Sequence, residues 1–255
     1  MSTPEPARLA EGLRAHTAAL AEAVTGADPA APVPTCPEWS LRDLVGHVGQ
    51  AHRWTTALVR TGRADAVPDP ADADPGPPDV WRGFLNEGAE DLVKAAEDVG
   101  PETIVHPFVG PLPVRFWLRR MAHETAVHHA DAALATGAAF TVAPDLASDA
   151  ICEALEFMAS PVAETLRPGL AALRGEDQSL HLDPEDTDDP GWLIVRTPEG
   201  PRWDRADGET ADVALGGPVR DLLLVFTRRL AVHDADVTVT GERALLDHWL
   251  ASTAF

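Results

Sequence analysis

Apolar residues recur at helical spacing along the first two thirds of the chain, and this periodicity limits the possible folds more than any other feature. In the second such segment, Leu44, Val48 and Leu58 share one helical face. The same kind of spacing predicts helices over about 7–25, 41–61, 79–98, 113–136 and 145–167. Amphipathic helices must bury their apolar faces against one another, so we expect a helical bundle.

Local signals mark the ends of two of these helices. Ser40, with Asp43 three residues later, forms a capping signal directly before an apolar run. The second helix should therefore begin at about residue 41 and stop at Gly62, while the fourth should stop at Gly137.

The pattern changes near residue 175, where short segments of strand character begin. Strands are predicted for "SLHLDP", "GWLIVRT", "ADVALGG" and "ADVTVTG", with a turn at "TPEGPRW". Helices are predicted for "ERALLDHWL" and for "PVRDLLLVFTRR", where Pro218 takes an allowed first-turn position. The fold class is therefore α+β, with a helical bundle over 1–170 and a small α+β domain over 175–255.

Composition narrows the classes of partner and compartment. The 255 residues carry a net charge of −21, which repels a phosphate backbone and makes nucleic acid an unexpected partner. No apolar run reaches the roughly 20 residues of a membrane span, and the N-terminus has no signal-peptide core. With only Cys36 and Cys152, the chain makes no disulfide framework, so we expect a cytoplasmic protein.

The segment "MAHETAVHHADA" resembles a zinc-protease helix, but its histidine spacing is wrong for H-E-x-x-H. Instead, Glu124 and His128 lie four residues apart on one helical face and could bind one divalent ion together. His47 borders the apolar stripe of the second helix and should point into the bundle as a third ligand. Two histidines and a glutamate suit catalytic zinc, although nickel, iron and cobalt also accept them. A chance helical pair and a hydrogen-bonded core histidine are the structural alternatives.

The remaining candidates have structural explanations. His123 and His129 should point away from the Glu124/His128 face as structural or solvated residues. His52 lies about 140° from the ligand face and should be at the surface. Asp131 could orient a ligand or could be exposed. Of the cysteines, we expect Cys36 in the turn before the second helix and Cys152 in the core.

Several blocks together resemble the mycothiol-dependent maleylpyruvate isomerase family, part of the DinB-like group of metal-dependent thiol enzymes. They are "TCPEWSLRDLVGHVGQAHRW", "RRMAHETAVHHADA", "GWLIVRTPEGPRW", "ADVALGGPVRDLLLVFTRR" and "VTVTGERALLDHWL". His129 stands where the family commonly has arginine. The resemblance implies a DinB-like helical bundle followed by a small α/β domain similar to sterol carrier proteins.

The resemblance also implies a site and a reaction. The metal ligands fall on His47, Glu124 and His128, and a functional arginine falls on Arg228 or Arg229, after Thr227, where the family usually has glycine. Mycothiol would be the thiol cosubstrate of an isomerase or S-transferase acting on a small electrophile, with the arginine pairing with its carboxylate. The resemblance further implies an actinobacterial source and a monomer.

Two other functions remain open at this stage. A metal-dependent hydrolase would use zinc-bound water and would need a general base, for which Asp131 is the only nearby acid in the sequence. A non-catalytic binder would hold an apolar ligand in the C-terminal domain. The sequence does not identify the substrate, and it does not choose between isomerase and transferase.

Overall fold

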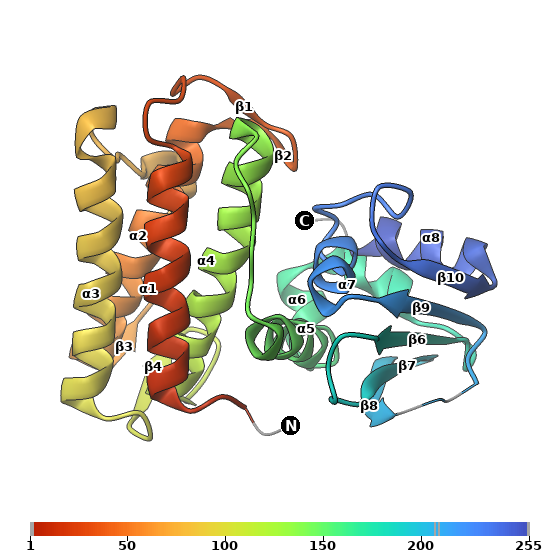
Figure 1. Cartoon of the computed structure of the whole chain (residues 1–255). Coiled ribbons are helices and arrows are strands. Elements are labelled where there is room, and N and C mark those ends of the chain that lie inside the picture. Colours follow the sequence, from red (N-terminus) through yellow and green to blue (C-terminus); the bar gives the residue numbers. More distant parts are fainter. Residues whose placement is uncertain (1–2, 207, 209, 254–255) are drawn as a thin grey trace. The chain divides into compact units, whose positions relative to one another are not determined.

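The computed structural model describes residues 3–206, 208 and 210–253, and it divides into two compact units (Figure 1). The N-terminal unit spans Pro4–Thr141, and the C-terminal unit begins at Val142. Within the described ranges, none of the helices has both the length and the apolar character that a membrane crossing requires.

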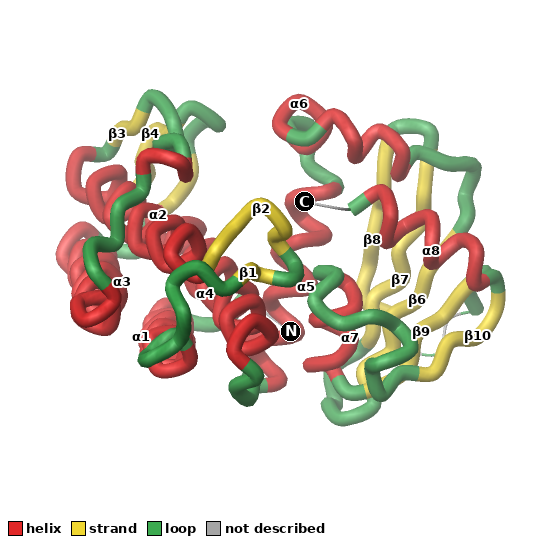
Figure 2. The backbone as a smooth tube through the Cα atoms, turned by 90° about the horizontal axis from the view of Figure 1, so that it is seen from above, coloured by secondary structure: helices red, strands yellow, loops and turns green. Residues whose placement is uncertain are grey.

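Four long helices form the N-terminal unit. They are α1 (Pro6–Ala23), α2 (Leu41–Thr61), α3 (Trp81–Val99) and α4 (Val114–Thr136). Helix α1 packs against α3 and α4, and α2 also packs against both, as the view along the helices shows (Figure 2). The bounds lie close to those predicted from apolar spacing, because each helix buries one apolar stripe in the bundle.

Short strands and turns connect these helices. Antiparallel strands β1 (Pro32–Val33) and β2 (Cys36–Ser40) form a hairpin that contacts α2, and β1 also contacts α4. A second small sheet joins β3 (Arg63–Ala64), β4 (Ile104–Pro107) and β5 (Leu112–Pro113). Single 3₁₀ turns occupy Pro70–Asp72 and Pro78–Val80.

The ends of α2 follow from the predicted signals. The Ser40 hydroxyl accepts from the backbone N–H of Asp43, and the Asp43 carboxylate accepts from the backbone N–H of Ser40 at 2.8 Å. This reciprocal pair satisfies two N–H groups that the helix leaves without partners. At the other end, Gly62 adopts a left-handed φ of +74°, which favours glycine.

A five-stranded sheet is the centre of the C-terminal unit, with strand order β10-β9-β6-β7-β8. The strands are β6 (Ser179–Pro184), β7 (Gly191–Thr197), β8 (Gly200–Ala206), β9 (Val213–Gly217) and β10 (Thr238–Gly241). Strands β6 and β9 pair in parallel, and the other pairs are antiparallel. The turn predicted at "TPEGPRW" is present but short, since it comprises only Pro198 and Glu199, and strand β8 begins at Gly200 and pairs with β7.

The helices of this unit are α5 (Pro144–Met158), α6 (Ala163–Leu166), α7 (Val219–Phe226) and α8 (Arg243–Ser252), with a 3₁₀ helix at Pro168–Leu173. The helix predicted over 145–167 is therefore two helices, since α5 ends at Met158.

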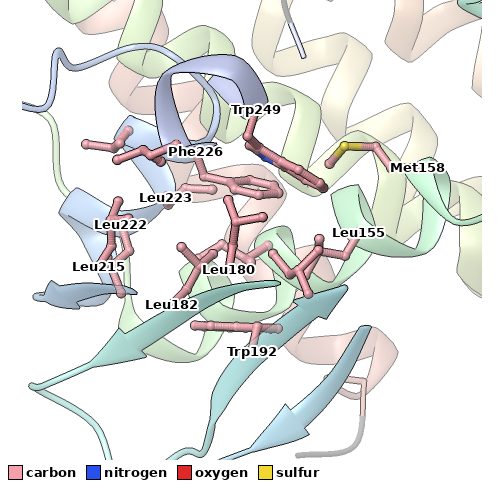
Figure 3. Packing of buried hydrophobic residues seen from close by; sticks show 14 of the residues in the cluster. Leu155, Met158, Leu180, Leu182, Trp192, Leu215, Leu222, Leu223, Phe226 and Trp249 are labelled. Carbon is pink, nitrogen blue, oxygen red and sulfur yellow. The ribbon is translucent and has the colours of Figure 1, made fainter. Parts of the chain in front are cut away.

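Helix α5 packs into the core of the C-terminal unit. Leu155 and Met158 lie in one buried cluster with Leu180, Trp192 and Trp249 (Figure 3). The sequence placed α5 in the bundle and put the boundary at 170–175, whereas the contacts divide the chain between residues 141 and 142. The apolar stripe of α5 predicts burial correctly, but it does not indicate which core receives the helix.

Candidate metal centre

Three side chains from two neighbouring helices meet in the N-terminal unit. His47 comes from α2, while Glu124 and His128 come from α4, and one ligand atom of each lies within 4.8 Å of the others. His47 Nε2 and Glu124 Oε1 are 3.2 Å apart, and the two imidazole rings meet edge to face at 4.9 Å between centroids. His128 is buried, and the other two are partly buried. The structure thus brings together the three ligands expected from the sequence.

A buried acid orients one of the imidazoles. Asp131 Oδ2 lies 2.8 Å from His128 Nδ1, and Asp131 Oδ1 accepts from the Thr35 hydroxyl at 2.5 Å. Asp131 is fully buried, so the expectation that it orients a ligand fits the structure, and the exposed alternative is wrong. Because Nδ1 is engaged by Asp131, Nε2 is the atom that His128 offers as a ligand. No sequence pattern indicates the role of Thr35, which lies 96 residues from Asp131.

The protonation states of the site suit a bound cation. Burial by itself raises the pKa of Glu124, but the charge of Arg120, 3.1 Å away, and the hydrogen bond with His47 outweigh it. The pKa of Glu124 is therefore held well below its usual range, and the side chain is ionised at neutral pH. Burial lowers the pKa of His128 despite the opposing hydrogen bond with Asp131, so its imidazole is neutral. An anionic carboxylate and a neutral imidazole are the forms that bind metal ions.

Trp39 of the β1–β2 hairpin covers part of the site. Its ring centroid lies 4.8 Å from that of His47 and 5.9 Å from that of His128. The Nδ1 atom of His47 is buried and has no hydrogen-bond partner among the described residues. Trp39 therefore packs against both imidazoles, in addition to the contacts of His128 with Asp131 and of His47 with Glu124.

The other candidate histidines, His52, His123 and His129, are all buried. His52 is fully buried and its Nε2 is hydrogen-bonded to Thr125 Oγ1 at 2.8 Å, so the expected surface position is wrong. The reason is that α2 packs against both α3 and α4, so it is buried on more than one face. His129 is buried with its Nδ1 3.2 Å from that of His16, and His123 is buried as well.

The two candidate arginines lie at the end of α7 in the C-terminal unit. The backbone N–H of Arg228 donates to Val225 O at 2.9 Å, and that of Arg229 donates to Leu224 O at 2.7 Å. This is a Schellman motif, in which Arg228 takes the left-handed position that usually holds glycine, with a φ of +64°. Arg229 Nη1 donates to Thr227 O at 2.7 Å and so caps its own helix.

Neither cysteine has a place in the triad. Cys36 lies in strand β2 rather than in a turn, and Cys152 of α5 packs against the C-terminal core, where its sulfur accepts from Trp192 Nε1 at 3.3 Å.

Comparisons with known proteins agree with this architecture. The family model described as "Mycothiol maleylpyruvate isomerase N-terminal domain" matches residues 10–133, which include all three candidate ligands. The crystal structure of a mycothiol-dependent maleylpyruvate isomerase superimposes with a TM-score of 0.62 at 16% identity, covering 95% of this chain and 97% of that chain. A histidine-to-alanine mutant of such an enzyme gives a TM-score of 0.58 at 16% identity, with the same coverage. No curated protein sequence matches. The shared fold confirms the predicted α+β class.

Proposed function

Residues 10–133 match the N-terminal domain of the mycothiol maleylpyruvate isomerase family. We propose that the chain is a thiol-dependent isomerase or S-transferase of this family, and that His47, Glu124 and His128 hold a divalent metal ion, zinc in the first place. The thiol is mycothiol, and the second substrate is a small electrophile that carries a carboxylate. The observation that carries this proposal is the convergence of three ligand atoms within 4.8 Å.

The surrounding residues keep the ligands in forms and orientations that suit a cation. Glu124 supplies a permanent negative charge, and Asp131 keeps the ring of His128 in one orientation through the 2.8 Å contact. A divalent ion with an open position would favour the thiolate form of a thiol that enters there. The side chains of the protein therefore need only to bind and orient, and the diffusible cosubstrate supplies the nucleophile.

The reaction then follows from thiolate chemistry. The sulfur adds to one carbon of a conjugated cis double bond, and the former double bond becomes a single bond that can rotate. Expulsion of the thiolate restores the double bond in the trans form. An S-transferase would keep the new carbon–sulfur bond, so both reactions use the same activated thiol.

Arg228 is the better candidate for binding the substrate carboxylate. Its side chain is exposed, and its backbone holds a left-handed conformation that is unfavourable for any residue with a Cβ. Arg229, in contrast, already stabilises the helix end by donating to Thr227 O. A strained backbone that glycine would relieve is a reason to look for a function of the side chain.

The hydrolase alternative has weaker support in this site. Asp131 was the candidate general base, yet it is fully buried and both of its carboxylate oxygens are engaged by His128 and Thr35. A base must reach the proton that it removes. We therefore favour thiol chemistry over hydrolysis by metal-bound water.

The lipid-binder alternative is also less favoured. A pocket in the C-terminal core, lined by aliphatic side chains together with Phe226 and Trp249, measures only about 10 Å³. One water molecule needs roughly that volume, so an apolar ligand of lipid size would require the core to open.

Two wider expectations rest on the same proposal. Mycothiol use points to an actinobacterial host, and we infer a cytoplasmic location because Cys36 and Cys152 remain thiols.

The first test is elemental analysis of protein purified without chelators or a polyhistidine tag, beside Glu124→Ala. We expect near-stoichiometric divalent metal in the natural chain, loss of the metal in the variant, and isomerisation of a cis conjugated carboxylate only when mycothiol is added. Turnover without any thiol would favour the hydrolase, and absence of metal from the natural chain would refute the metal site.

A further inference from the structure

The metal site depends on the spacing between two helices. His47 belongs to α2, and the other two ligands belong to α4, so any sliding or rotation between these helices changes the ligand set. Productive sites must be held within about 0.5 Å of their working geometry. The only ligand-to-ligand hydrogen bond across this interface among the described contacts joins His47 and Glu124 at 3.2 Å, and one contact still allows the helices to pivot.

A second polar contact links the same two helices. His52 of α2 is hydrogen-bonded to Thr125 Oγ1 of α4 at 2.8 Å, and both residues are buried. His52 lies five positions after His47, which is about 7.5 Å along the helix axis. Thr125 directly follows Glu124 in the chain, so its contact fixes the rotation of α4 at the ligand itself.

The ring of His52 is confined from the opposite side as well. A Cβ atom placed on Gly88 of α3 would lie 3.3 Å from His52 Cβ and 3.5 Å from its Nδ1. Helix α3 therefore approaches closely behind the imidazole, and Thr125 lies in front of it. The imidazole of His52 is therefore held between α3 and α4, and its contact with Thr125 couples the position of α2 to that of α4.

We propose that His52 and Thr125 are positioning residues that hold α2 and α4 at the spacing at which His47, Glu124 and His128 can bind one metal ion. This inference rests on the proposed metal site and adds two residues to its support. It also gives a function to His52, which has no other role in the proposed chemistry.

The test compares three single substitutions in the full chain. Thr125→Val removes the hydroxyl with little change of shape, and Thr125→Ser retains it. Thr17→Val is the matched control, because Thr17 is equally buried in α1 and its hydroxyl donates only within that helix, to Leu13 O at 2.7 Å. Metal-free protein is titrated with Zn²⁺ and Co²⁺ against a chromophoric chelator, and the Co²⁺ absorption spectrum is recorded.

We expect Thr125→Val to bind both ions at least about tenfold more weakly and with an altered Co²⁺ spectrum, as for other residues that support metal ligands. Thr125→Ser should bind as the natural chain does, and so should Thr17→Val despite its loss of stability. His52→Phe should weaken binding similarly, and the double variant His52→Phe/Thr125→Val should be no weaker than either single variant.

The possible failures are distinguishable. Natural affinity in Thr125→Val, or an equal loss in Thr17→Val, would overturn the positioning role while leaving the metal site intact. A natural chain that binds neither ion would overturn the proposed metal site and this inference together.

Discussion

Replacing Arg228 with glycine should make the protein more stable and less active. A left-handed backbone costs a residue with a Cβ roughly 1–2 kcal/mol, and Arg228 has a φ of +64° at the end of α7. Glycine recovers this energy but loses about 0.4–1 kcal/mol through its greater freedom in the unfolded chain. The net gain is about 0.5–1 kcal/mol, or roughly 1–4 °C in Tm for a protein of this size.

Turnover should change in the opposite direction. A hydrogen bond to a charged group contributes about 1.5–3 kcal/mol, so loss of the guanidinium should lower kcat/KM by about tenfold to a hundredfold. Thermal unfolding followed by circular dichroism gives the first quantity, and the mycothiol-dependent assay gives the second.

Asp177→Gly provides the matched control for Arg228→Gly. Asp177 also has a left-handed backbone in the same unit, with a φ of +65°. Its replacement should raise Tm, by less because aspartate tolerates this region better, and should leave turnover unchanged. A fall in Tm for Arg228→Gly would refute the strain argument, and full activity would refute its role in substrate binding.

Two further predictions concern the N-terminal unit. Burial lowers the pKa of both His16 and His129 to about 4, so the unfolded chain binds protons first as pH falls below about 6.5. The free energy of unfolding therefore has its full value above about pH 6.5 and falls towards about pH 4. Urea unfolding at pH 7.5 and pH 5 should give free energies of unfolding that differ by on the order of 2 kcal/mol per histidine, and equal values would contradict this. Gly49→Ala should destabilise by about 1–3 kcal/mol, because its Cβ would lie 1.9 Å from the ring of Phe84, and an unchanged urea midpoint would show that α2 and α3 separate easily.

Features with short-range causes were predictable from the sequence. The start of α2 depends on Ser40 and Asp43, three residues apart, and its end depends on the backbone freedom of Gly62. The pairing of Glu124 with His128 follows from the helical repeat alone. In each case the residues that determine the feature lie within one or two turns of one another.

Features that depend on packing between helices were not predictable in this way. The helical angle of His52 relative to His47 was correct, but the sequence did not show that α2 has neighbours on more than one side. Thr35 reaches Asp131 across 96 residues, and α5 joins the C-terminal core through Leu155 and Met158. No periodicity within one segment encodes the identity of a distant partner.

The order of strands in the C-terminal sheet has a consequence for how copies of the chain meet. Its two outer strands, β8 and β10, present open edges that could pair with an edge of another molecule. Strand β8 carries Pro201, which cannot donate a backbone hydrogen bond, and exposes Arg202 and Asp204, while β10 is only four residues long. Such edges discourage strand-to-strand association, so we expect the chain to stay dispersed at high concentration.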